Sequence, residues 1–285
     1  MLLAVNHPNS FLDAIILCSL FNRPVYSLAR GDAFKNKFFA KILYHLKMFP
    51  VYRVSEGVEN MDENYKTFDA CKKIFKQNGT VLIFSEGRCI NEWHLRPLKK
   101  GTARLAISSW EEGIDLTVLP VGINYNSFTK FGKNIHLNFG EPINKEQIDF
   151  KNSHGNAIKQ FNETLNAQLK NLVYEIEPDD TKKIQEVFFV KQSLLKKILL
   201  FVPAIFGFIL NAPIYYFIKW LHKTLVKEPG HFDSVIIGFL LLLYPFYLLA
   251  ICCLLFFYWG IAVAVSGFIL LPLFGFCMVQ LKRQF

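Results

Sequence analysis

The sequence lacks charge over one long stretch: from Ser234 to Leu281 there is no Lys, Arg, Asp or Glu. This run is about twice the ~20 residues that one membrane-spanning helix requires. Most of the charged residues therefore lie in the first two-thirds of the chain, and the formal net charge is +9. A basic domain suits an anionic substrate or an anionic membrane surface. Because no nucleic-acid-binding motif is present, we do not expect nucleic acid as a partner.

The sequence lacks a CxxC pair with metal-ligand spacing, although it contains six cysteines. Cys252, Cys253 and Cys277 lie in the apolar stretch, where a thiol acts as a small hydrophobic side chain. The sequence therefore predicts a reducing compartment, with no disulfide, no zinc or other metal and no redox cofactor. No signal peptide is recognisable.

Segments with strand character alternate with segments of helical length before the apolar stretch. Strands are expected at 2–6, 25–28, 49–53, 80–84, 116–123 and 135–139, and helices at 11–21, 35–47, 59–77, 102–112 and 154–175. Residues 35–47 mix basic and apolar residues like an amphipathic helix. This order predicts a layered α/β fold, with a central mixed sheet flanked by helices. A core strand that starts at residue 2 also predicts that further sequence precedes it.

The chain is expected to divide into three parts. Residues 1–190 form the α/β domain, 191–233 form a basic interfacial amphipathic region, and 234–285 form a transmembrane helical hairpin. The hairpin is expected at 235–257 and 261–280, with a turn at Gly260 beside the interfacial aromatic residues Tyr258 and Trp259. The apolar segment 198–218 contains two prolines and an asparagine, so we expect it to lie in the membrane interface.

Basic clusters on either side of these segments favour one topology. If only the hairpin spans the membrane, all three clusters face the cytoplasm, as the positive-inside rule requires, and three spans would place two of them outside. The α/β domain is therefore expected on the cytoplasmic face of a membrane. The clusters are Lys191, Lys196 and Lys197; Lys219, Lys223 and Lys227; and Lys282 and Arg283.

The segment from Asn6 to Asp13 places His7 at a strand end and Asp13 just inside a helix. Such a pair can act as a general base: the imidazole takes a proton from a hydroxyl, and the carboxylate fixes its tautomer. Taken by itself, the segment is explained as well or better by helix capping.

Other segments carry polar groups to the same region of an α/β fold. Glu86, Gly87 and Arg88 follow the buried strand 80–84, where such sheets place ligands. Lys100 lies at a helix start, well placed for a phosphate. Residues 118–122 end another buried strand. Each segment alone is also compatible with an ordinary salt bridge, a solvated turn or a core strand.

In this order, the four segments resemble the acyltransferase superfamily of phospholipid synthesis, which includes glycerol-3-phosphate and lysophosphatidate acyltransferases. The family has a His–Asp block, a block ending in Arg, a Phe-Pro-Glu-Gly block followed by Thr-Arg-Ser, and a Val-Pro block. In this chain the first block corresponds to His7 and Asp13, the second to residues 49–53, the third to residues 84–88 and the fourth to residues 118–121. The resemblance covers about residues 2–145.

The resemblance implies direct acyl transfer from acyl-CoA or acyl carrier protein to a hydroxyl of a glycerol phosphate, without a covalent enzyme intermediate or a cofactor. His7 would act as the base, and Asp13 would orient it. Arg53, Arg88 and Lys100 would bind the acceptor phosphate, while Glu86 and Gly87 would shape its pocket. Membrane lipid would be the further partner.

Three departures bear on the acceptor and on the site. Five residues separate His7 from Asp13, where the family pattern has four, and this wider spacing resembles the branch that acylates glycerol-3-phosphate or dihydroxyacetone phosphate. Ser85 replaces the proline, and Arg88 follows Gly87 directly. Alternatives are acylation of lysophosphatidate to phosphatidic acid, acylation of a lyso-ornithine lipid, and a catalytically inactive membrane scaffold. A transporter is disfavoured, because two spans without charged residues offer no pathway.

Overall fold

The computed structural model of the chain describes residues 1–52, 61–150, 153–226 and 229–281. The chain forms two compact units. The first comprises residues 1–124 and 136–179, and the second comprises residues 125–135 and 180–285. The domain limits predicted at 190 and 233 stay a prediction, since this division groups residues 125–135 and 180–190 with the apolar helices.

A six-stranded sheet in the order β3-β2-β4-β1-β5-β6 organises the first unit. The first five strands in this order are paired in parallel. The last pair is antiparallel, because Asn126 N–H donates to Asn134 O and Gly140 N–H to Pro120 O. The predicted mixed sheet is therefore confirmed. The strands are β1 Leu2–Val5, β2 Val25–Arg30, β3 Met48–Val51, β4 Thr80–Phe84, β5 Val118–Tyr125 and β6 Ile135–Phe139.

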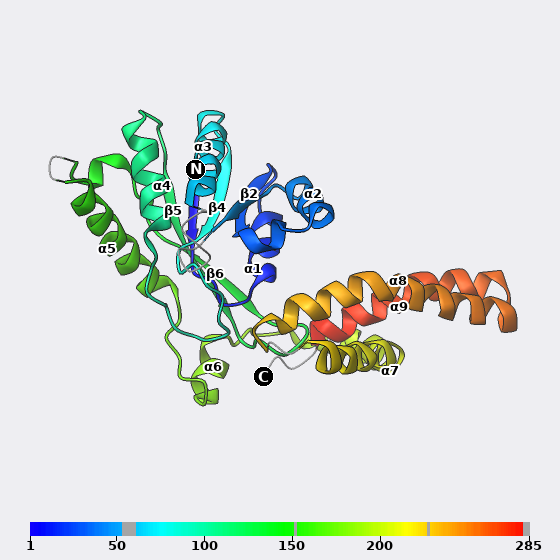
Figure 1. Cartoon of the computed structure of the whole chain (residues 1–285). Coiled ribbons are helices and arrows are strands. Elements are labelled where there is room, and N and C mark those ends of the chain that lie inside the picture. The colour runs from blue at the N-terminus through cyan, green and yellow to red at the C-terminus, as the bar shows by residue number, and fades with distance from the viewer. Residues whose placement is uncertain (53–60, 151–152, 227–228, 282–285) are drawn as a thin grey trace. The chain divides into compact units, whose positions relative to one another are not determined.

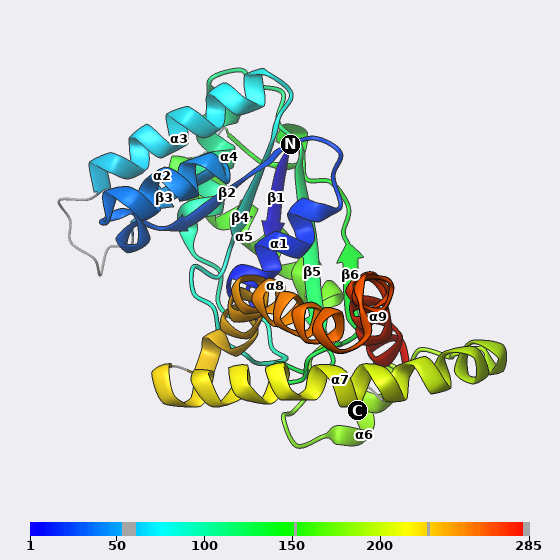
Figure 2. The ribbon, with the colours of Figure 1, turned by 90° about the vertical axis from the view of Figure 1, so that its right-hand side faces the viewer.

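Helices follow the strands in the predicted order, with ends that differ from the expected ones by a few residues. They cover both faces of the sheet: α1 lies on one face, and α4 and α5 lie on the other (Figures 1 and 2). The helices of this unit are α1 Phe11–Ser19, η1 Gly31–Phe34, α2 Lys37–His45, α3 Met61–Lys76, α4 Lys100–Glu111, η4 Lys145–Gln147 and α5 His154–Leu172.

Strand β1 is the innermost element of the fold, paired on both edges and completely buried. Its side chains alternate between the two faces. Leu2 and Ala4 join the core that α3, α4 and α5 build on one face. Leu3 and Val5 point to the opposite face, which α1 covers with its buried residues Ala14 and Leu17. The residues directly after β1 are thereby fixed in space by a buried strand.

The second unit contains three helices that are long and apolar enough to cross a membrane, judged by length and composition. The predicted hairpin is present, and it turns at Gly260, whose φ of 84° suits glycine. The helices of this unit are α6 Thr181–Val187, α7 Leu194–Leu225, η5 Pro229–His231, α8 Phe232–Trp259 and α9 Ile261–Leu281.

The apolar segment 198–218 lies within a longer helix, α7, which extends beyond it at both ends. Helix α7 continues for 32 residues through Pro203 and Pro213, because each proline removes only one N–H donor and packing against neighbouring helices can hold the rest of the helix. By length and composition, the candidate spans among the described residues therefore number three rather than two. Whether α7 spans the membrane or lies at its surface stays a prediction.

Helix α7 packs across the α8–α9 hairpin rather than along it. Figure 1 shows the hairpin lengthwise and α7 nearly end-on, and the 90° turn to Figure 2 exchanges these views. The crossing is close, since a Cβ on Gly207 would lie 1.9 Å from the carbonyl oxygen of Phe274. Asn211 Nδ2 donates to Gly207 O at 2.9 Å, and Tyr244 OH donates to Asn211 Oδ1 at 3.0 Å. A polar contact thus fixes α7 against α8 within the apolar bundle.

An ion pair joins the segment 125–135 to the rest of the second unit. Lys133 Nζ pairs with the carboxylate of Asp233, in the first turn of α8, and both side chains are buried. The ammonium group also lies 5.9 Å from the ring centre of Tyr125. A buried charge is stable only when it is paired in this way.

Candidate active site

The candidate site lies where two neighbouring parallel strands end. Val5, the last residue of β1, is paired with Phe84, the last residue of β4. The turns that follow the two strands therefore leave the sheet at the same level. Parallel α/β sheets place ligands at this carboxyl edge. His7 lies two residues beyond the end of β1, and Glu86 lies two residues beyond the end of β4.

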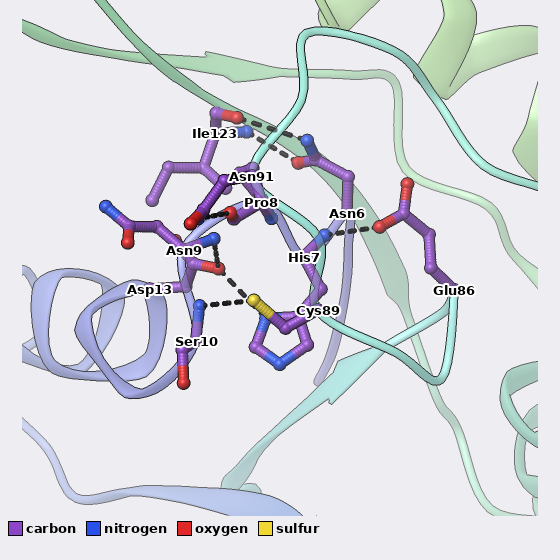
Figure 3. Close-up of polar contacts among 10 residues, drawn as sticks. All are labelled: Asn6, His7, Pro8, Asn9, Ser10, Asp13, Glu86, Cys89, Asn91 and Ile123. Carbon is purple, nitrogen blue, oxygen red and sulfur yellow. Dashed lines mark hydrogen bonds and ion pairs between the residues drawn. The ribbon is translucent and has the colours of Figure 1, made fainter. Parts of the chain in front are cut away.

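The structure brings His7 and Asp13 together. Nδ1 of His7 lies 2.9 Å from Oδ2 of Asp13, and the same oxygen accepts the N–H of Asn9 at 2.8 Å (Figure 3). Helix α1 begins at Phe11 and places Asp13 in its first turn, fully buried beneath the histidine. An acceptor at Nδ1 assigns the proton of a neutral imidazole to Nδ1, which leaves the lone pair on Nε2.

The imidazole ring is held on a second side by β4. It stacks on the ring of Phe84 with 3.8 Å between centroids and 10° between planes. The side chain of His7 remains 17% exposed. No hydrogen bond within the described residues is recorded for Nε2, so this atom is available to a substrate hydroxyl. The pair therefore has the geometry of a general base.

Glu86 fixes the backbone of His7. Its Oε2 accepts the N–H of His7 at 2.8 Å, and its Oε1 accepts the N–H of Arg96 at 2.9 Å. Burial raises the pKa of Glu86, and the hydrogen bonds from Arg96 and His7 partly offset this effect. We expected Glu86 to shape the acceptor pocket. Both of its oxygens are engaged by backbone groups, so its observed contacts position His7 and the segment around Arg96.

Gly87 continues the turn after β4 with a φ of 65°, which L side chains rarely adopt. A Cβ at this position would also lie 3.0 Å from Cγ of Lys99. The glycine is therefore required by the conformation of the turn.

Further contacts join the turn after β1 to residues 89–91. Ser10, which has a φ of 53°, donates its N–H to Cys89 Sγ at 2.8 Å. Asn91 Nδ2 donates to Pro8 O at 2.7 Å. Burial raises the pKa of the Cys89 thiol to about 12, so this sulfur is an acceptor in the structure rather than a nucleophile. Figure 3 shows these contacts around the His7 ring.

Asn6 connects the same turn to β5. Its Nδ2 donates to Ile123 O at 3.1 Å, and its Oδ1 accepts the N–H of Ile123 at 2.8 Å. Sequence reasoning missed the roles of Asn6, Cys89 and Asn91. The only signal available was that these polar residues follow closely after strands β1 and β4.

In the part of the chain that the structure describes, no hydrogen bond or ion pair joins the predicted phosphate-binding cations to His7. Arg88 lies in the turn after β4, and Lys100 begins α4; both are exposed and form no ion pair with a described residue. The prediction for Arg53 falls outside the described residues. Arg96, which sequence reasoning did not select, is half-buried and pairs with Glu92 at 2.7 Å. Among the described residues, no group of three or more His, Cys, Asp or Glu side chains is placed to hold a metal ion.

Comparison with known proteins assigns the class. Residues 1–124 match the model of the family described as Acyltransferase. This stretch contains β1, α1, β4 and the His7–Asp13 pair, so the first unit carries an acyltransferase domain and the protein is an acyltransferase enzyme, as the resemblance implied.

Among solved structures, the chain is similar to the 1-acyl-sn-glycerophosphate (LPA) acyltransferase PlsC from Thermotoga maritima. The two are 14% identical with a TM-score of 0.41, and the match covers 68% of each chain. No curated protein sequence matches at a significant level. A structural likeness this low is compatible with several acceptors, so the class rests on the family match.

Proposed function

We propose that the chain transfers a fatty acyl group from a thioester to a hydroxyl of a glycerol phosphate at a membrane surface. The observation that carries the proposal is the buried His7–Asp13 pair, which leaves Nε2 open at the carboxyl edge of a sheet in an acyltransferase domain. An inactive scaffold has no need for an oriented imidazole with one free nitrogen.

In the proposed reaction, Nε2 of His7 removes the proton from the acceptor hydroxyl. The oxygen attacks the thioester carbonyl, a C–O bond forms, and the C–S bond breaks. The thiolate leaves and receives the proton that His7 holds, which completes the balance. Asp13 stabilises the imidazolium during the transfer. The donor is the thioester of CoA or of an acyl carrier protein.

The first acceptor to test is glycerol-3-phosphate or dihydroxyacetone phosphate, because five residues separate His7 from Asp13. An acceptor panel with radiolabelled acyl-CoA and acyl carrier protein tests the assignment. Product from glycerol-3-phosphate, absent in His7→Ala, is the expected result. If product forms only from lysophosphatidate, the enzyme instead catalyses the second acylation, which makes phosphatidic acid. No product from any acceptor would contradict the proposal.

Arg88 and Lys100 are proposed to bind the acceptor phosphate, together with Arg53. Both described cations lie in the turn or helix that follows the site and have no carboxylate partner among the described residues. Arg88→Ala and Lys100→Ala should each raise KM for the phosphate acceptor by about 10-fold, the loss expected for one charge-assisted hydrogen bond. Lys170→Ala, an exposed lysine on α5, is the control. An equal change in KM for the thioester would remove the phosphate role.

We further propose that α8 and α9 span the membrane, that α7 lies along its surface, and that the catalytic unit faces the cytoplasm. The support is the crossing of α7 over the hairpin and the lysines near both ends of α7. Both ends of the hairpin are then on the cytoplasmic side, as the positive-inside rule prefers. Labelling of single cysteines at the two ends of α7 in intact cells tests this topology. Labelling of one end only from outside would show that α7 spans.

A further inference from the structure

Helix α2 is unusual in the first unit because none of its residues is buried. Apolar side chains that would normally face a core are exposed: Phe38 by 69%, Phe39 by 57%, Ile42 by 41% and Leu46 by 52%. By contrast, α1, α4 and α5 each bury an apolar face. A cluster of exposed aromatic and aliphatic side chains of this kind marks a surface that contacts something else.

The helix is well formed despite this exposure. The side chain of Asn36 caps it by accepting the N–H groups of Phe38 and Phe39. Its inner side rests on the unit through the half-buried residues Ala40 and Leu43. At 100° per residue, Phe38, Ile42 and Leu46 form one continuous stripe on the helix, with Phe39 beside it.

Positive charge accompanies the apolar stripe. Lys35, Lys37 and Lys41 are exposed, and none forms an ion pair with a described residue. The neighbouring carboxylate of Asp32 is already paired with Arg30. A short helix with an apolar stripe and uncompensated lysines has the composition of helices that lie in the headgroup region of a bilayer. Lysines near an anionic leaflet strengthen such binding by electrostatic attraction.

We propose that α2 is a membrane-binding surface of the catalytic unit, which inserts Phe38, Phe39 and Ile42 among the headgroups of an anionic bilayer. This contact is separate from the apolar helices α7–α9 and does not depend on which acceptor the enzyme acylates. A bilayer is favoured over a protein partner because the lysines lack carboxylates and because the same chain carries helices long enough to cross a membrane. The contact would hold the His7 site next to the lipid phase where an acylated product leaves.

A tryptophan reporter in the full chain tests this surface. Phe38→Trp and Tyr65→Trp form a matched pair, because both positions are 69% exposed and both lie on helices of the first unit. Each variant is reconstituted in nanodiscs of phosphatidylcholine with phosphatidylglycerol, with or without bromine on the acyl chains. The signal of the four native tryptophans is subtracted using the unmodified chain.

The added tryptophan at position 38 should lose at least about half of its fluorescence in brominated discs, as expected for a side chain at the acyl boundary. The one at position 65 should be unaffected. Lys37→Glu with Lys41→Glu in the Phe38→Trp background, and discs without phosphatidylglycerol, should each weaken the quenching.

Equal quenching at positions 38 and 65 would overturn the proposal. A second result would also overturn the proposal: in detergent, the tryptophan at position 38 becomes more buried as the protein concentration rises. That result would identify α2 as a contact between two copies of the chain. Acyl transfer by the same preparations to a water-soluble acceptor is measured alongside. Active preparations without quenching would refute the lipid contact alone, whereas inactive ones that are quenched would refute the proposed reaction alone.

Discussion

Glu86 accepts a hydrogen bond from the backbone N–H of His7 at 2.8 Å, so a carboxylate after one strand sets the position of an imidazole after its neighbour. The two residues are far apart in sequence, and the pairing of β1 with β4 brings them to the same edge of the sheet. This relationship separates two tasks in the site. Asp13 sets the tautomer of the imidazole, and Glu86 sets where the ring stands.

Asp13→Asn should lower kcat by about 10²–10⁴-fold with little loss of stability. One oxygen, Oδ2, accepts both the N–H of Asn9 and the N–H at Nδ1 of His7, so the oxygen of the amide can keep both hydrogen bonds. The amide carries no negative charge, however, so it would stabilise the imidazolium that forms during proton transfer much less than the carboxylate does. Steady-state kinetics with a thermal melt on the same sample measures both effects, and a normal kcat would exclude the proposed base.

Glu86→Gln should change the pH dependence of stability. Burial raises the pKa of Glu86 above its ordinary value of 4.5, so the folded protein binds this proton more tightly than the unfolded chain does. Stability should therefore fall as pH rises from about 4.5 through the folded-state pKa, and this part of the slope should be absent in Glu86→Gln. Melting temperatures across acidic pH provide the measurement. Parallel curves for the two proteins would contradict the role of burial.

Cys89→Ser should behave more like the unmodified enzyme than Cys89→Ala. A serine hydroxyl can accept the N–H of Ser10, whereas alanine leaves that N–H without the sulfur it contacts. The alanine variant should lose about 1–2 kcal/mol of stability, together with part of its activity. A nucleophilic role for the thiol would give the opposite pattern, in which both variants are inactive although folded.

Gly87→Ala should destabilise the first unit by about 1–2 kcal/mol, the cost of a Cβ in a left-handed conformation. The φ of 65° and the approach of Lys99 both require glycine here. Gly101→Ala is the control, because a Cβ there meets no atom within 4 Å. Urea or thermal denaturation of the two variants in parallel should separate them; equal stabilities would show that the turn adapts.

Gly207→Ala should loosen α7 from the hairpin. The added Cβ would overlap the carbonyl oxygen of Phe274, and relieving such overlap costs about 1–3 kcal/mol. Gly238→Ala in α8 has open space around the new methyl group and serves as the control. The melting temperature in detergent should fall for the first variant only. If both melt alike, the close crossing of α7 and α9 does not form in solution.

Local patterns allowed much of the fold to be predicted from the sequence. The helix expected at 59–77 is α3, which ends at Lys76. Asn78 then has a φ of 56°, and the N–H of Gly79 donates to the carbonyl oxygen of Ile74. The meeting of His7 and Asp13 was likewise predictable, because a strand end followed by a first helical turn brings the two residues close. Such features depend on a few neighbouring residues and their backbone preferences.

Contacts between distant segments could not be predicted in the same way. The roles of Glu86, Cys89 and Asn91 depend on which strands are neighbours in the sheet, which is set by the packing of the whole core. The length of α7 depends in the same way on contacts between distant segments. Pro203 and Pro213 disfavour a helix locally, and only the tertiary contacts of Gly207 and Asn211 show what supports it.

The central place of β1 sets the order in which the enzyme matures. Leu2 is paired with Val81 on one side and with Val118 on the other, so the strand before His7 remains incomplete until both later strands have been synthesised. Pairings this distant in sequence slow folding, because a long loop must be closed before any contact is gained. The region around His7 therefore cannot be complete before residue 121 has been synthesised, although β1 is the first strand of the chain.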